Sequence, residues 1–327
     1  MDSLVSVILI SYNHAEYVIT AVESVFKQTY KNWELIIMEN GSTDGSQKLL
    51  QKYEINPRVR IVYGEKNIWP SHIQNKSIKY ANGDFISFLA SDDYYLSEKL
   101  EKQMKCFEKL SSEWGVVYSP HINLNVFTGI QTKMDCISVS GDILKDLFTL
   151  PHSGFINCYT PMIRKECLER YTCYEDLWTE GENLFLKIAI KYKFFCLDEP
   201  VLVMRVHDRN EGFAGRRNCE LNQIILTRLM ELPEFPEEYI KYVRARLATL
   251  MAMYAWQELR LGTDAEWARQ KLYVAVSTYW KQLFKPRIII GMSLSFLPAK
   301  LRACLNNCVN NVLRRRITFS YADRNDS

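Results

Sequence analysis

Four short runs of apolar residues stand out in the first part of the chain, and amphipathic segments separate them. The apolar runs lie at residues 4–10, 33–38, 59–63 and 84–89. Between them, apolar residues recur every three or four positions at residues 16–27, 45–53 and 70–80. An unbroken apolar run is typical of a strand buried on both faces, whereas recurrence every three or four positions indicates a helix. This alternation predicts an α/β fold with right-handed crossovers and a mainly parallel sheet.

The pattern changes in the rest of the chain. It predicts helices at residues 100–110, 164–170 and 183–192, and short strands at residues 116–119, 194–197 and 201–206. Residues 123–150 show no clear element. From Asn218 onward the spacing is helical almost to the end. We therefore expect an α/β domain at residues 1–212 and a helical extension at residues 213–327.

The polar cluster after the fourth apolar run contains two adjacent carboxylates. Asp92 and Asp93 follow that run directly, after Ala90 and Ser91. In an open α/β sheet, ligands bind beyond the carboxyl ends of the strands. Two carboxylates at such a place suit magnesium or manganese, ions that usually carry a substrate's phosphates. The alternative is a solvated turn that caps a helix starting near Ser97.

Length and cysteine content narrow the class of protein. At 327 residues the chain can form one large domain, or one domain with an extension. Its nine cysteines contain no CxxC pair and are odd in number, which argues against a disulfide framework or a zinc site. The first residues lack the basic lead of a signal peptide, and no apolar run reaches the roughly 20 residues needed to cross a bilayer. We therefore expect a cytoplasmic protein.

The net charge of +3 conceals a strongly basic region near the end of the chain. Ten Lys or Arg residues and no Asp or Glu lie between Trp267 and Ala322, interleaved with apolar residues. This mixture is typical of helices at an anionic membrane surface. A helix that packs on its own domain with a solvated basic face is an alternative, as is an oligomer interface. We expect no nucleic acid partner, because no recognisable binding motif accompanies the charge.

Six motifs, in order over about two thirds of the chain, resemble those of family 2 glycosyltransferases. The chain has VSVILISYN at residues 5–13, SVFKQTY at 24–30 with WELII at 33–37, and NGSTDGS at 40–46. It continues with Asn75 and ANGD at 81–84, then DEPVL at 198–202 and RVH at 205–207. The resemblance implies the GT-A fold, a Rossmann-like arrangement with a mainly parallel sheet, over roughly residues 4–210.

The resemblance also implies a reaction, the inverting transfer of a sugar from a nucleotide diphosphate donor with the help of Mn²⁺ or Mg²⁺. The leaving diphosphate gathers negative charge, which a divalent ion can neutralise. Asp92 is the expected main metal ligand, with Asp93 beside it and His207 as a late ligand.

The residues expected to bind the nucleotide lie at three predicted strand ends and on the predicted third helix. They are Ser11, Tyr12, Asn13, Glu39, Asn40, Ser42, Asn75, Ser91 and Asp92. Tyr12 is expected to stack on the base, although a core position is the more frequent place for an aromatic residue. Glu39 and Asn40 stand where the family has two Asp residues, which implies an altered contact to the base or ribose.

An inverting transfer needs a base that takes the proton of the acceptor hydroxyl. The family keeps this base in a Glu-Asp motif at the start of a late helix. An ungapped match places Gly181 on the usual Asp, so we expect Glu182 or Glu180 to serve instead. In the alternative interpretation both are solvated acids in the first helical turn.

The resulting hypothesis is a glycosyltransferase of surface polysaccharide biosynthesis, such as that of O-antigen or capsule. We expect a UDP-sugar donor, a saccharide or lipid-linked saccharide acceptor, and a peripheral position on the inner face of the cytoplasmic membrane. The missing base Asp makes a catalytically degenerate GT-A protein, acting as a binding or scaffold subunit, the second hypothesis. A nucleotidyltransferase is the third, but residues 11–14 lack the glycine and basic residues of its phosphate loop.

Overall fold

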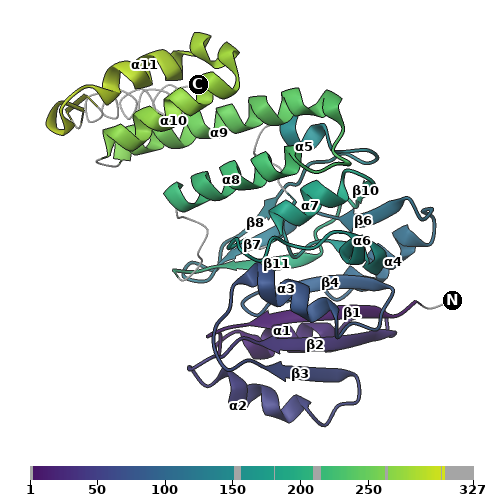
Figure 1. The fold of residues 1–327 in the computed structure, drawn as a ribbon. Coiled ribbons are helices and arrows are strands. Elements are labelled where there is room, and N and C mark those ends of the chain that lie inside the picture. Colours follow the sequence, from purple (N-terminus) through teal and green to yellow (C-terminus); the bar gives the residue numbers. More distant parts are fainter. Residues whose placement is uncertain are drawn as a thin grey trace, which may run out of the picture. The chain divides into compact units, whose positions relative to one another are not determined.

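The computed structural model of this protein describes residues 3–150, 156–179, 181–208, 215–261, 264–302 and 304–305. The chain divides into two compact units (Figure 1). The α/β unit comprises Met1–Phe213 and Leu232–Pro236. The helical unit comprises Ala214–Glu231 and Glu237–Ser327.

A seven-stranded sheet forms the centre of the α/β unit (Figure 1). Its strands lie in the order β10 (Lys193–Cys196), β6 (Trp114–Tyr118), β9 (Met162–Arg164), β4 (Phe85–Ala90), β1 (Val5–Ser11), β2 (Trp33–Glu39) and β3 (Val59–Tyr63). β1 pairs in parallel with β2 on one side and with β4 on the other. Only β9 runs antiparallel to its neighbours in this sheet, among the described residues. The sheet is therefore mainly parallel, as predicted, and its strand order reverses direction between β1 and β4.

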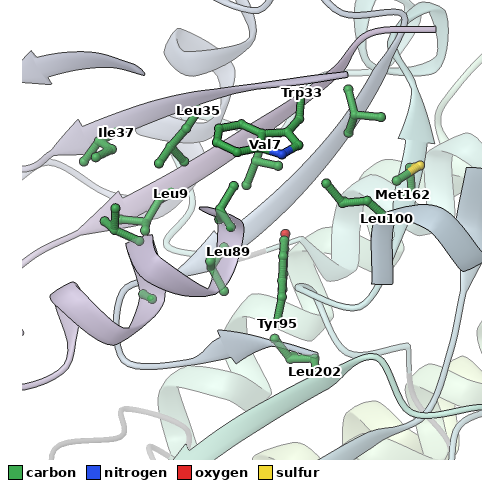
Figure 2. Close-up of a cluster of buried hydrophobic side chains, with 14 of the residues drawn as sticks. Val7, Leu9, Trp33, Leu35, Ile37, Leu89, Tyr95, Leu100, Met162 and Leu202 are labelled. Carbon is green, nitrogen blue, oxygen red and sulfur yellow. The ribbon is translucent and has the colours of Figure 1, made fainter. Parts of the chain in front are cut away.

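The apolar runs of the sequence supply the core of this unit. The helices of the unit are α1 (Val18–Phe26), α2 (Ser46–Leu50), α3 (Pro70–Ile78), α4 (Lys99–Phe107), α5 (Asp146–Thr149), α6 (Lys165–Arg170) and α7 (Glu182–Ile188). Alternate residues of β1 and β2 point to one face of the sheet, where they meet side chains from α1 and α4 (Figure 2). Val7 and Leu9 are fully buried there, beside Leu35 and Ile37. Burial of both sheet faces explains why the runs are apolar without interruption.

Two local predictions differ from the structure. The predicted helix at residues 164–170 begins at Lys165, and Arg164 is the last residue of β9 instead. The predicted helix after β2 is α-helical only to Leu50 and continues as a 3₁₀ turn, η1 (Gln51–Tyr53). β9 has only three residues, which is too short for a periodic signal.

A second, four-stranded sheet lies in the same unit, in the order β5 (Tyr94–Tyr95), β11 (Leu202–Val206), β7 (His121–Asn125) and β8 (Gln131–Met134). β7 and β8 form an antiparallel hairpin in a region where the sequence pattern predicts no element. All four residues of β8 are exposed, so the strand has no apolar face to reveal it. β5 directly follows the carboxylates after β4 and pairs with β11. This pairing brings residues 205–208 beside the end of β4.

The helical unit contains α8 (Gly215–Met230), α9 (Ile240–Leu261), α10 (Ala265–Thr278) and α11 (Pro286–Ser295), with 3₁₀ turns η3 (Glu237–Tyr239) and η4 (Trp280–Phe284). α9 packs against α8, α10 and α11. The C-terminal part of the chain is thus helical, as predicted. Within the described residues, every helix is too short or too polar to span a bilayer.

Candidate active site

The candidate site lies beyond the carboxyl ends of β1, β2 and β4. Ile10 is opposite Ala90 of β4, and Ser11 is opposite Glu39 of β2, so the three loops that follow start side by side. The strand order reverses between β1 and β4, and such a switch point leaves a crevice where α/β proteins bind ligands. The residues predicted from the strand ends therefore share one edge of the sheet.

Asp92 lies between two histidines at this edge. The Nε2 atom of His207 is 3.1 Å from Oδ2 of Asp92, and Nδ1 of His14 is 3.9 Å from Oδ1. Nδ1 of His14 also lies 2.8 Å from the hydroxyl of Ser91. The two imidazole rings meet edge to face, with centroids 5.9 Å apart. His207 is almost completely buried, so its ring is held in this direction.

Arg205 and Asp93 hold the segment of His207 in place. The carboxylate of Asp93 accepts a hydrogen bond of 2.9 Å from the backbone N–H of Arg205. The guanidinium of Arg205 donates a hydrogen bond of 2.6 Å to the backbone carbonyl of Asp92. Asp93 is buried, and its hydrogen bond reaches across to β11 rather than to the helix that follows. The alternative interpretation of the two carboxylates as a solvated helix cap therefore does not hold.

His14, Asp92 and His207 can each offer one ligand atom to a metal ion, and these atoms lie within 4.8 Å of one another. Imidazole nitrogens and a carboxylate oxygen form a donor set that suits a divalent first-row ion. Asp93, a predicted ligand, is outside this group. The donor set thus fits a metal ion held by one carboxylate and two histidines.

His14 is the residue that sequence reasoning missed. It lies in the loop after β1, beside Tyr12 and Asn13, which were both assigned to the nucleotide. The signal that could have found it is its position, because every strand end at this edge contributes to one crevice. A search for ligand side chains within three residues of each strand end would have included it.

The carboxylate of Glu39 accepts hydrogen bonds from the turn that follows it. It accepts from the backbone N–H groups of Gly41 (3.1 Å) and Ser42 (2.9 Å), and from the side chain of Gln47 (2.8 Å). Gly41 has a φ of 77°, and a Cβ atom there would lie 2.7 Å from the backbone of Lys66. The turn therefore requires glycine, and Glu39 stabilises its backbone.

Asn40 connects the same turn to the loop after β3. Its amide donates hydrogen bonds to the side-chain oxygen of Asn67 (2.7 Å) and the carbonyl of Ile68 (2.9 Å). Its own oxygen accepts a bond of 3.1 Å from the N–H of Ile68. A carboxylate could not make the two donated bonds. The Asn that replaces the family's Asp is therefore matched to its surroundings.

Asn13 and Ser42 join the loop after β1 to the turn after β2. Asn13 has a positive φ of 51°, its N–H donates to the hydroxyl of Ser42 (2.9 Å), and its side chain accepts from Thr43 (2.8 Å). Nearby, Asp44 accepts a bond of 2.8 Å from the N–H of Ala15. Burial alone would raise the pKa of Asp44, but its hydrogen bonds with Ser46 and Ala15 outweigh this and lower it. The loop that carries His14 is thus fixed at both ends.

The remaining predicted nucleotide residues have different surroundings. Tyr12 is 37% exposed, so its ring is accessible at the strand end. The hydroxyl of Ser11 is buried and has no hydrogen-bond partner in the described part of the chain. Asn75 lies on α3 and exchanges hydrogen bonds with the backbone of Cys173, at 3.0 and 2.8 Å. Asn75 therefore holds the segment before α7 beside α3.

The predicted catalytic base lies at the start of α7. The helix begins at Glu182, and Gly181 before it has a φ of 153°, a conformation that L-residues rarely adopt. Glu180 lies outside the described residues. On the same helix, Lys187 donates to the carbonyl of Thr172 and lies 4.0 Å from the centroid of the Tyr174 ring. Burial lowers the pKa of Lys187 to about 8.

A cavity of about 230 Å³ opens beside His207. It is lined by Glu16, Tyr17, Val126, Phe127, His207 and Asp208. The ring of Tyr17 stacks on that of His207, with centroids 5.2 Å apart. The cavity therefore combines two aromatic rings with two carboxyl groups next to a potential metal ligand.

The sequence profile described as glycosyl transferase family 2 matches residues 6–172 of this chain. The matched residues include Ser6–Ser11 of β1, all of β2 and β4, and the loops after them that carry His14 and Asp92, whereas His207 lies beyond the match. The chain belongs to glycosyl transferase family 2.

Curated relatives support this membership. The chain is 30% identical over 233 residues to the uncharacterized glycosyltransferase RT0329 of Rickettsia typhi, a match that covers 68% of each chain. It is 36% identical over 108 residues to WfgD of Escherichia coli, a UDP-Glc:alpha-D-GlcNAc-diphosphoundecaprenol beta-1,3-glucosyltransferase. That match covers 33% of this chain and 42% of WfgD. The chain spans 37% to 42% of the length of several such relatives.

Solved structures show that the fold is GT-A. TarS 1-349 of S. aureus in complex with UDP-GlcNAc superposes with a TM-score of 0.60 at 16% identity, over 84% of this chain and 89% of that one. The mannosyltransferase PcManGT of Pyrobaculum calidifontis, in complex with GDP-Man and Mn²⁺, gives a TM-score of 0.57 at 16% identity. That superposition covers 93% of this chain and 86% of PcManGT. The mainly parallel sheet of this chain is thus that of a GT-A glycosyltransferase.

Proposed function

We propose that this glycosyltransferase moves a sugar from a UDP-sugar to a hydroxyl of a saccharide or lipid-linked saccharide, with inversion at the anomeric carbon. The proposed pathway is the synthesis of a surface polysaccharide, and the name of the relative WfgD supports the donor and acceptor classes, since it gives UDP-Glc and a diphosphoundecaprenol-linked sugar. In this proposal residues 1–212 carry the transfer and residues 213–327 support it from the cytoplasmic face of a membrane. The observation that carries the proposal is the group formed by His14, Asp92 and His207 at the switch point of the sheet.

The nucleotide is proposed to lie across the ends of β1 and β2. The exposed ring of Tyr12 offers a stacking surface for the base, and the unpartnered hydroxyl of Ser11 offers a hydrogen bond at the same strand end. The diphosphate would then lie towards the end of β4, near Asp92. Glu39, Asn40 and Asn13 fix the loops that shape this site through the hydrogen bonds described above.

A metal ion is proposed to be held by Asp92, His207 and His14. When bound, it would neutralise the charge that gathers on the leaving diphosphate. Two imidazole ligands favour Mn²⁺ over Mg²⁺, which prefers oxygen ligands. Asp93 supports this site indirectly, since its carboxylate fixes the backbone of Arg205, two residues before His207.

Glu182 is the proposed catalytic base. In the transfer, the acceptor hydroxyl attacks the anomeric carbon, the bond to the diphosphate oxygen breaks, and the hydroxyl proton passes to the base. Glu182 is the first residue of α7, where the family places its base. Glu180 is the alternative for the same role.

The acceptor sugar is proposed to enter the cavity beside His207. The rings of Tyr17 and Phe127 offer apolar surfaces to the face of a sugar, and Glu16 and Asp208 can accept hydrogen bonds from its hydroxyls. At about 230 Å³ the cavity is smaller than the ~300–1,000 Å³ of sites for drug-sized ligands. It therefore suits one sugar ring rather than an extended chain.

The test is a thermal-shift panel of UDP, GDP, dTDP and CDP, each with and without Mn²⁺. Wild type is compared with Asp92→Ala and with the control Asp135→Ala, whose side chain is 81% exposed. A ligand at about 100 times its Kd stabilises the native state by roughly 2.7 kcal/mol. We expect this stabilisation with UDP and Mn²⁺ in wild type and the control, and its loss in Asp92→Ala.

Transfer itself is then measured with the matching UDP-sugars and a panel of free and diphospholipid-linked saccharides. NMR of the product shows whether the anomeric configuration is inverted. If no nucleotide stabilises the protein under any condition, the degenerate GT-A hypothesis replaces this one.

A further inference from the structure

One segment of the helical unit, residues 280–301, exposes large apolar side chains. They lie on η4, on α11 and just beyond, and we call them the apolar face: Trp280, Leu283, Phe284, Ile289, Ile290, Phe296 and Leu301. Phe284 is 70% exposed and Trp280 is 62% exposed, and their rings contact each other edge to face at 5.8 Å. Single exposed apolar residues are ordinary, but seven within residues 280–301 form a concentration of the kind that marks an interaction site.

The interior side of the same segment is unusually polar. Gln282, Ser295 and Arg302 are buried, although they alternate with the exposed apolar residues. The side chain of Gln282 donates a hydrogen bond of 2.8 Å to Thr249. Ser295 accepts from the guanidinium of Arg269 at 3.2 Å through its hydroxyl and at 2.8 Å through its carbonyl. These polar contacts fix which side of the segment faces inward.

Close packing fixes the orientation of α11 as well. Ile288 and Gly291 are buried, and a Cβ atom on Gly291 would lie 3.2 Å from the side chain of Leu272 on α10. Ile289 and Ile290 consequently face away from the unit. A rotation that buried these two residues would break the packing of Gly291 and the hydrogen bonds of Ser295.

Basic residues alternate along the chain with those of the apolar face. Lys281, Lys285, Arg287 and Lys300 are exposed within the same segment. No acidic residue occurs between Trp267 and Ala322. The surface is thus complementary to a partner that is both apolar and anionic.

We propose that the apolar face binds the surface of an anionic lipid bilayer, with η4 and α11 lying in the plane of the headgroups. Trp280, Phe284 and Ile289 would enter the boundary between headgroups and acyl chains, where aromatic side chains are favoured. Lys281, Lys285 and Arg287 would contact the anionic headgroups. An acidic protein partner would be complementary to the basic residues. It would not account for the burial pattern, in which polar side chains face inward and large apolar side chains face solvent, because that pattern suits an extended apolar medium.

This inference rests on the membrane association proposed above for residues 213–327. The apolar face shares no residue with the proposed active site, so the two can be tested separately. The test is co-sedimentation of the full chain with vesicles of phosphatidylcholine alone or mixed with phosphatidylglycerol, at low and physiological salt. Two multiple variants are compared with wild type: Trp280→Ala with Phe284→Ala, and Lys281→Gln with Lys285→Gln and Arg287→Gln. The control is Ile55→Ala, which removes a 91% exposed apolar side chain from the α/β unit.

We expect wild type and the control to bind the mixed vesicles, more weakly as salt rises. The aromatic variant should lose at least about tenfold in partitioning. The charge variant should lose about fivefold per cation removed, together with the salt dependence. Unchanged circular dichroism and an unchanged thermal response to UDP and Mn²⁺ would show that both variants are folded.

Two results would overturn the proposal. In the first, wild type stays in the supernatant with both kinds of vesicle. In the second, wild type is a dimer in solution that the aromatic variant converts to monomer without any vesicle binding, so that a second copy of the chain covers the apolar face.

Discussion

The two units of this glycosyltransferase depart from the usual burial pattern in opposite ways. In the α/β unit, polar side chains such as Glu39, Asn40 and Asp93 are buried at one edge of the sheet, each with hydrogen-bond partners. In the helical unit, apolar side chains such as Trp280 and Phe284 are exposed. Buried polar groups are costly unless paired, and large apolar patches are costly in water. The buried polar groups of the α/β unit fix the loops of a ligand site, and the exposed apolar groups of the helical unit provide a surface that can bind a partner.

The comparison separates residues that would touch a ligand from residues that hold the loops. The first kind should affect catalysis or metal binding with little change in stability. The second kind should affect stability first.

Glu182→Gln should lower the transfer rate by about 10² to 10⁴, the usual contribution of a general base. Stabilisation by UDP and Mn²⁺ should be unchanged, because the substitution removes only the proton acceptor. The measurement is the rate of UDP release in the presence of acceptor, with thermal shift in parallel. The control is Glu166→Gln, an exposed acid in the first turn of α6. An equal loss in both variants would show that the effect is not specific to Glu182 and that the base lies elsewhere.

His14→Ala should weaken Mn²⁺ binding by about tenfold to a hundredfold, since it removes one of three proposed protein ligands. Isothermal titration with Mn²⁺ in the presence of UDP measures this loss. The control is His72→Ala, which removes a half-exposed imidazole that lies 3.4 Å from Glu175 on the same unit. If His14→Ala binds Mn²⁺ with unchanged affinity, His14 is not a ligand and only Asp92 and His207 remain as proposed ligands.

Asn40→Asp should lower the free energy of unfolding by about 1–3 kcal/mol, because a carboxylate cannot donate to Asn67 and Ile68. Denaturant unfolding followed by circular dichroism measures this change. Asn56→Asp is the matched control, because the side-chain oxygen of Asn56 accepts from the N–H of Arg58 and a carboxylate can do the same. A more stable Asn40→Asp variant, resembling the family motif, would contradict the loop-holding role.

The sequence pattern was sufficient for the α/β class, the parallel strands and the edge that carries the site. It also pointed to Asp92, and the resemblance to family 2 glycosyltransferases added His207. The two side chains lie 3.1 Å apart although 115 residues separate them in the chain. Apolar runs and strand-end residues are local signals, and parallel sheets place all such ends at one edge.

The rest depends on pairings between distant segments. β8 is exposed along its whole length and β9 has three residues, so neither has a periodic pattern. His14 meets Ser91 and Asp92 because β1 pairs with β4, and it meets His207 through the pairing of β5 with β11. The side chains of Glu39 and Asn40 are likewise directed by their partners in the turn after β2 and in the loop after β3. Local periodicity describes neither of these segments.

The most direct test of the central claim is pulsed electron paramagnetic resonance of Mn²⁺ bound to the full chain with UDP. If His14, Asp92 and His207 hold the ion, the spectrum shows coupling to imidazole nitrogens. This coupling should weaken in His14→Ala and in His207→Ala, and disappear in the double variant. Tightly bound Mn²⁺ without nitrogen coupling, or with coupling that survives the double variant, would contradict the account.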